Sequence, residues 1–115
     1  MIETDGGLLR GTLDVLILKA LSWGPRHGYA VAEWVRTITD EEILVEEGPL
    51  YTALHRLEKR GWVTCEWGYS ENNRRARYYQ LSRAGRQQLR NEVSTWERYV
   101  RAIGKALVAT APLPA

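Results

Sequence analysis

Cysteine, histidine and phenylalanine are scarce or missing in this chain. One Cys and two His occur among its 115 residues, so an internal disulfide cannot form and these residues alone cannot close a structural zinc site. A single Cys is typical of a reducing compartment. Phe is absent, and the large aromatic residues are five Trp and six Tyr, whose polar groups need hydrogen-bond partners or water.

Long hydrophobic runs are missing as well. No stretch approaches the roughly 18 apolar residues that predict a membrane span, and the N-terminal MIETDGGLLRG has neither the basic start nor the apolar core of a signal peptide. We therefore expect a cytoplasmic protein without a membrane partner. With 115 residues and 44% hydrophobic content, the chain has the size and composition of one folded domain.

Charge is nearly balanced over the whole chain, with a net value of +2, but it is uneven along the chain. Residues 1–49 contain 4 Lys and Arg against 9 Asp and Glu, residues 50–90 contain 9 against 3, and residues 91–115 contain 3 against 2. The middle of the chain is therefore strongly basic. Such a cluster attracts polyanions, although an ordinary solvated surface would have the same composition.

Residues 7–23 (GLLRGTLDVLILKALSW) predict a helix that is apolar on nearly all sides. One face carries Leu13, Leu16, Ile17, Ala20 and Leu21. Val15 and Leu18 place apolar groups on the other face, and a helix of this kind is usually buried on two sides. Since the core of so short a chain covers one side, we expect the second face to contact a partner subunit.

Two more helices are predicted before residue 62. Residues 27–39 carry an inward set of Val31, Trp34, Val35 and Ile38. The β-branched segment at residues 43–45 is compatible with a very short strand. Gly48 and Pro49 open a third helix, because Gly is accepted as an N-cap and Pro at the first helical position, and Gly61 ends it.

The periodicity then changes. Val63, Cys65 and Trp67 alternate with polar residues, residues 70–75 are turn-like and residues 76–81 are strand-like, which predicts a β-hairpin. Ser82 can cap a last helix that runs to about residue 107. Its apolar residues are spaced by alternating intervals of 4 and 3: Leu89, Val93, Trp96, Val100, Ile103 and Leu107. This heptad pattern predicts a dimerisation seam.

This order of elements predicts a mainly α chain with a small β-hairpin. We expect a winged helix-turn-helix over residues 1–81, a C-terminal dimerisation helix over residues 82–109, and a disordered tail over residues 110–115. In such a fold one helix enters the DNA major groove and the hairpin, or wing, contacts the backbone or the minor groove. Double-stranded DNA is therefore the expected partner.

The candidate contacts on the third helix are Tyr51, Thr52, His55, Arg56 and Lys59. Arg56 and Lys59 can bind phosphates or guanine acceptors, and Thr52 can reach a base edge. His55 can donate a hydrogen bond, and the Tyr51 hydroxyl can reach a phosphate. Each of these residues is also compatible with an ordinary solvated position.

The wing supplies three arginines within four positions. Arg74 and Arg75 stand at the predicted tip, where guanidinium groups commonly contact phosphates or enter a narrow minor groove. Arg77 can instead lie along the strand. The alternative is an ordinary solvent-exposed loop without a binding role, but such a loop seldom contains three clustered arginines.

These segments also resemble the PadR family of bacterial transcriptional regulators. The resemblance covers residues 8 to about 100 and is carried by LLRGTLDVLILKAL, by HGY at 27–29, by GPLYTALHRLEKRG at 48–61 and by YYQLSRAG at 78–85. It implies a homodimeric winged-helix repressor whose C-terminal helix packs across the dimer. It also implies DNA contacts by Tyr29, Tyr51 and the wing arginines.

The wing tip departs from the family pattern. Family members often carry a Gly before the arginine, whereas Asn72 and Asn73 precede Arg74 here. Asn tolerates a positive φ angle well, so a similar turn is compatible with this sequence.

Three single residues have two interpretations each. By resemblance to small multidrug-sensing members, Trp96 stacks a planar aromatic ligand at the dimer centre; alternatively it only packs in the seam. His27 suits a turn or cap better than a sensor. Cys65 points inward and suits the core, since a redox role needs exposure and a lowered pKa.

Two other classes of function compete with a DNA-binding repressor of a palindromic operator. A winged-helix module that binds protein would use the same fold, but the basic segment favours DNA. An enzyme is not supported, because the sequence has no nucleophile–base arrangement, no metal cluster and no phosphate-binding Gly loop. No cofactor is expected.

Overall fold

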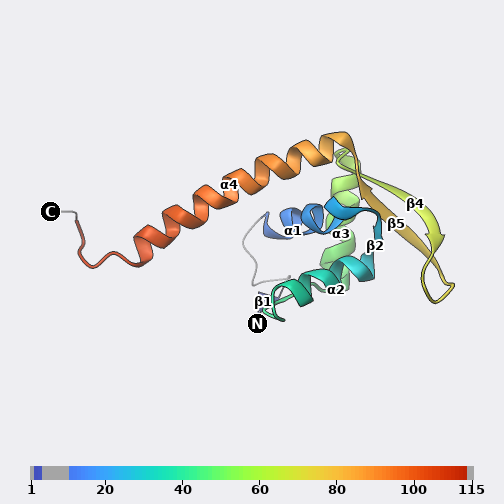
Figure 1. Ribbon diagram of the computed structural model, residues 1–115, viewed down its shortest axis with the longest axis horizontal. Helices are drawn as coiled ribbons and strands as arrows, with labels where there is room; N and C mark the ends of the chain where they lie inside the picture. The colour runs from blue at the N-terminus through green and yellow to red at the C-terminus, as the bar shows by residue number, and fades with distance from the viewer. Residues whose placement is uncertain (1, 4–10, 114–115) are drawn as a thin grey trace.

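The fold is a body of three helices flanked by a β-hairpin and extended by one long helix (Figure 1). The computed structural model describes residues 2–3 and 11–113. Its main elements are α1 (Thr12–Ala20), α2 (Gly28–Ile38), α3 (Glu47–Lys59), β4 (Val63–Tyr69), β5 (Arg75–Leu81) and α4 (Arg83–Leu107). The predicted winged helix-turn-helix is thus confirmed. The start of the first predicted helix, residues 7–10, lies outside the described residues.

Four short elements complete the fold within the described residues, and of these the sequence indicated only the strand at residues 43–45. A 3-10 turn (Leu21–Trp23) follows α1, and β2 (Arg26–His27) joins the hairpin in a sheet of order β2-β5-β4. β1 (Ile2–Glu3) pairs in parallel with β3 (Ile43–Leu44). Strands of two residues have too few positions for a detectable alternation.

The core forms where α1, α3 and the sheet meet. Its fully buried members include Ile17, Leu18, Leu21, Leu54 and Leu57. α1 contacts α2, α3 and α4, so other parts of the same chain cover both of its apolar faces. Leu18, expected to face a partner, is therefore inside its own core. Val15 is half-buried against that core.

One predicted core residue is exposed. Ile38, expected to point inward, is 60% exposed. It is the last residue of α2, where the helix extends beyond the core. Val35 and Val31, one and two turns earlier, are fully buried as predicted.

Side-chain caps start two of the helices. The Nδ1 atom of His27 accepts a hydrogen bond from the Ala30 backbone N–H (3.1 Å), which confirms the cap interpretation. Ser82 caps α4 as predicted, because its Oγ accepts from the Gly85 N–H (3.0 Å). The N-cap of α3 is Glu46 rather than Gly48. Pro49 fits inside the first turn, where backbone N–H groups have no helical partner.

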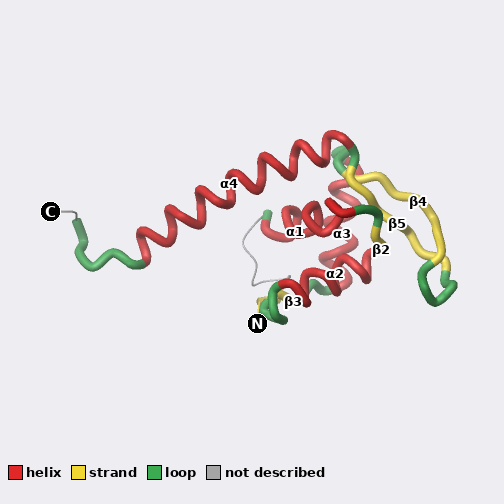
Figure 2. Tube along the Cα trace, viewed as in Figure 1, coloured by secondary structure: helices red, strands yellow, loops and turns green. Residues whose placement is uncertain are grey.

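The C-terminal half of α4 projects away from the body (Figures 1 and 2). Leu89 is buried and Val93 packs against the core, but Val100, Ile103 and Leu107 are 61%, 42% and 79% exposed. The molecule is accordingly elongated, measuring 63 × 29 × 21 Å. Within the described part of the chain, no helix is both long and apolar enough to cross a bilayer.

A glycine fixes the start of α4 against the end of α3. A Cβ atom at Gly85 would lie 1.9 Å from the carbonyl oxygen of Trp62. That oxygen already accepts a hydrogen bond from the Ser82 backbone N–H (3.0 Å). The close approach of the two backbones therefore requires a residue without a side chain and sets the direction in which α4 leaves the body.

We expect Gly85→Ala to destabilise the fold, because the added methyl group forces α4 away from Trp62. The free energy of unfolding should fall by about 1–3 kcal/mol or more, as for other overpacked sites, measured by urea denaturation. Gly48→Ala is the matched control, because a Cβ there meets nothing within 4 Å. Equal stability of the two variants would contradict the packing argument.

Candidate nucleic-acid interface

The outer face of α3 carries four of the five predicted contact residues in exposed positions. Leu50, Ala53, Leu54 and Leu57 point into the core. Helical spacing then turns Tyr51, Thr52, His55 and Lys59 outward, and all four are exposed. The face therefore offers hydroxyl, imidazole and ammonium groups to a ligand as broad as a DNA groove.

Arg56 lies on the flank of α3 and is directed toward α1. Its guanidinium forms an ion pair with the carboxylate of Asp14, which is only 9% exposed. This contact spans 42 residues of sequence. In the free chain Arg56 thus ties α3 to α1, a use that the sequence did not predict.

The opposite flank of α3 is tied to the wing. Arg77 Nη2 lies 3.6 Å from Glu58 Oε1, and Arg77 Nε donates to the half-buried Cys65 Sγ at 3.0 Å. The hydrogen bond to Cys65 raises the pKa of Arg77. Burial likewise raises the pKa of neighbouring Tyr79 and keeps its phenol neutral at neutral pH. Arg77 therefore lies along the strand and fixes the wing beside α3.

The wing tip presents two arginines on a tight turn. Asn73 has a φ angle of 59°, and its N–H donates to the Ser70 carbonyl oxygen (2.8 Å). Asn thus supplies the left-handed residue of this turn. Arg74 and Arg75 are exposed, and neither forms an ion pair with any residue that the structure describes.

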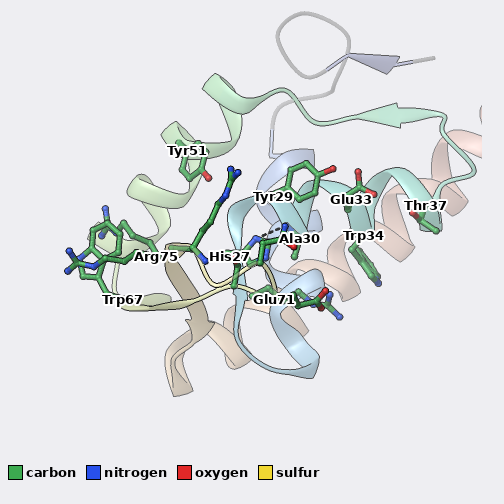
Figure 3. A pocket seen from close by; sticks show the side chains of 16 residues that line it. His27, Tyr29, Ala30, Glu33, Trp34, Thr37, Tyr51, Trp67, Glu71 and Arg75 are labelled. Carbon is green, nitrogen blue, oxygen red and sulfur yellow. Dashed lines mark hydrogen bonds between the residues drawn. The ribbon is translucent and has the colours of Figure 1, made fainter.

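A groove of about 860 Å³ runs between α2, α3 and the wing (Figure 3). In Figure 3, Tyr29 lines it from α2, Tyr51 from α3, and Trp67 and Arg75 from the hairpin. Both tyrosines implied by the family resemblance therefore face one space. Tyr29 is 69% exposed.

Gly28 explains how Tyr51 fits beside α2. A Cβ atom at Gly28 would lie 2.6 Å from the Tyr51 hydroxyl oxygen and 2.8 Å from its ring. The glycine of the HGY segment thus lets the phenol lie directly against the first turn of α2. Two of the segments that carry the family resemblance, HGY at 27–29 and GPLYTALHRLEKRG at 48–61, meet at this contact.

Sequence reasoning missed the role of Trp67 in this groove. The alternation predicts that Val63, Cys65 and Trp67 share one face of the hairpin, on which Cys65 is expected to point inward. The hairpin, however, extends past the core, and exposure along this face rises from 1% at Val63 to 60% at Trp67. The sequence does contain one signal for this exposure: the predicted strands are longer than the core is wide, so their outer ends must extend beyond it.

The seam residues of α4 fall into two groups. Leu89 and Val93 pack on their own core, whereas Val100, Ile103 and Leu107 are exposed. Trp96 lies between these groups and is half-buried. Its ring is edge-on to that of Tyr99, with 5.8 Å between the ring centroids. The exposed apolar surface of α4 therefore begins near Trp96.

We expect Arg56→Ala to reduce stability, because Asp14 would then be buried without its cation. The free energy of unfolding should fall by about 1–3 kcal/mol, measured by urea denaturation. Lys59→Ala, in an exposed control position one turn later, should change it by about 0.5 kcal/mol or less. Unchanged stability of Arg56→Ala together with lost duplex binding would instead make Arg56 a DNA contact.

Comparison with known proteins agrees with this architecture. Residues 17–91 match the sequence profile described as "Transcriptional regulator PadR-like family". A solved transcriptional regulator from Clostridium thermocellum is 33% identical, with a TM-score of 0.75 over 84% of this chain and 90% of that one. A PadR family regulator from Eggerthella lenta is 31% identical, with a TM-score of 0.72 over 88% of this chain and 86% of that one. A PadR family regulator from Clostridium difficile is 26% identical, with a TM-score of 0.70 over 86% of this chain and 100% of that one. This chain therefore belongs to the PadR-like family of transcriptional regulators.

Proposed function

We propose that this regulator is a homodimeric repressor that binds a palindromic operator in double-stranded DNA. The observation that carries the proposal is the groove that Tyr51 of α3 lines together with the exposed wing arginines Arg74 and Arg75. The exposed face of α3 continues from Tyr51 to Thr52 and His55. A DNA duplex needs both features at once, because base edges are read in a groove while flanking phosphates are neutralised by cations.

The exposed side chains of α3 and those that line the groove beside it have different roles in this proposal. Lys59, Arg74 and Arg75 neutralise phosphates, and the hydroxyl groups of Tyr29 and Tyr51 can donate to phosphate oxygens. Thr52 and His55, at the centre of the exposed face of α3, are placed to read base edges in the major groove. Arg77 and Arg56 hold the wing and α3 in position.

A protein-binding winged helix is the second candidate, and the surface favours DNA over it. Protein interfaces are depleted of charge at their centre, whereas this groove is lined by Arg74 and Arg75, which form no ion pair with any described residue. Net positive charge on this segment also favours a polyanion.

The partner subunit is proposed to cover the exposed half of α4. Val100, Ile103 and Leu107 repeat at heptad spacing on the part of α4 that the described residues of its own chain leave exposed. A second copy, related by two-fold symmetry, buries this surface and places two reading helices on one face of a duplex. That symmetry accounts for the palindromic operator.

Trp96 is proposed to stack a planar aromatic ligand at this two-fold seam and so to release DNA. Its half-buried ring lies where the covered part of α4 gives way to the exposed part. Plain packing in the seam is the competing role. Quenching of Trp fluorescence by such a ligand, lost in Trp96→Leu, distinguishes the two.

The double variant Arg74→Ala/Arg75→Ala tests DNA binding. Each arginine that neutralises one phosphate contributes about 0.9 to the slope of log K against log salt concentration, so the slope should become shallower by about 2. Fluorescence anisotropy of a labelled duplex over a salt series measures it. Arg98→Ala/Arg101→Ala removes the same charge from exposed positions on α4 as a control. Equal slopes for both double variants would refute the wing contact.

The double variant Val100→Glu/Ile103→Glu tests the dimer, because carboxylates in an apolar seam repel each other and cost desolvation. Sedimentation equilibrium at micromolar concentration should give a dimer for the unsubstituted protein and a monomer for this variant. Arg98→Glu/Arg101→Glu, between the same turns but off the seam, should remain dimeric. A monomeric unsubstituted protein would overturn the proposed assembly.

A further inference from the structure

The inner face of the wing carries a regular arrangement of aromatic and cationic side chains. Residues of β4 face residues of β5 in four pairs on this side: Val63 with Leu81, Cys65 with Tyr79, Trp67 with Arg77, and Tyr69 with Arg75. The first two pairs lie against the core. The outer two pairs lie beyond the core, on the exposed part of the hairpin. Each of them places an aromatic ring opposite a guanidinium group.

Within these outer pairs, Trp67 and Arg75 are stacked. The Arg75 guanidinium carbon lies 4.3 Å from the centre of the Trp67 ring, a cation–π contact across the diagonal of the ladder. Arg77, directly opposite Trp67, lies farther from it at 5.9 Å. Figure 3 places Trp67 and Arg75 together at the wing end of the groove.

The two arginines differ in their other partners. Arg77 is held by Glu58 and by Cys65. Within the described residues, the Arg75 side chain makes no hydrogen bond or ion pair, and its stacking partner is the Trp67 ring. Arg75 is thus the cation whose direction depends on the indole.

Stacking uses the face of a guanidinium group and leaves its N–H donors free in the plane. An arginine that is already stacked loses less rotational freedom when it binds a phosphate. Because the entropy cost of binding is then smaller, the affinity is higher. Trp67 itself is 60% exposed, so the ring is not needed to fill the core.

We propose that Trp67 is a positioning residue that orients Arg75 toward the DNA backbone or minor groove. The inference rests on the proposed DNA binding and adds to it a residue that acts through another residue. A direct role, in which the indole itself stacks on or wedges between bases, would give Trp67 the same exposure but would not depend on Arg75.

A double-mutant cycle separates these roles. Binding of a labelled duplex is measured by anisotropy for the unsubstituted protein, Trp67→Leu, Arg75→Ala and the double variant. We expect Trp67→Leu to weaken binding about fivefold with Arg75 present and less than about twofold in the Arg75→Ala background, as coupled residues do. Trp67→Tyr, which keeps an aromatic face, should restore most of the affinity.

The salt dependence gives a second readout that loss of wing structure would not reproduce. Trp67→Leu should keep the slope of log K against log salt concentration, since Arg75 still reaches its phosphate, whereas Arg75→Ala should make it shallower by about 1. Trp23→Leu is the matched control: this exposed indole also stacks on a cation, Lys19 Nζ at 4.8 Å, but lies outside the wing.

Two results would overturn the inference. Equal weakening by Trp67→Leu with and without Arg75 would assign the indole a direct contact, and unchanged binding by Trp67→Leu would remove its role. Either result leaves the proposed DNA binding intact, because the unsubstituted protein still binds. Failure of the unsubstituted protein to bind any duplex would overturn both.

Discussion

The placement of α3 is the constraint on which the rest of the structure depends. Its leucine face is buried in the core, and its two flanks are tied by ion pairs, through Arg56 to Asp14 of α1 and through Glu58 to Arg77 of the wing. These contacts leave one face of α3 outward and set the wing at a fixed place beside it. Without them, the exposed side chains of α3 and the wing tip could not meet a single ligand.

The long helix adds a second constraint at the far end of the domain. The contact of Gly85 with the Trp62 carbonyl sets the direction of α4, and that direction carries an apolar half-helix away from the body. In the proposed dimer, the separation of two reading faces would then depend on how rigidly α4 is joined to the body. The backbone contact at Gly85, which leaves no room for a side chain, is suited to hold α4 rigidly against the body.

Much of this architecture is predictable from local pattern, and the exceptions have a common cause. Helix and strand periodicity, the Ser82 cap and the basic wing depend on neighbours in sequence, and the structure agrees with them. Leu18, Arg56 and Trp67 depend instead on distant parts of the chain. Packing by α2, α3 and α4 encloses Leu18, Asp14 from α1 draws Arg56 aside, and the hairpin outreaches the core, leaving Trp67 in the groove.

The central claim is that the exposed face of α3 and the wing together bind one half of a symmetric DNA site. Selection of bound duplexes from a random pool with the purified chain, followed by hydroxyl-radical footprinting, tests it most directly. The predicted result is one enriched near-palindrome with two equivalent protected half-sites, centred about one helical turn (roughly 10 bp) or a multiple apart. No enriched sequence, or protection of a single unsymmetrical half-site, would contradict the account.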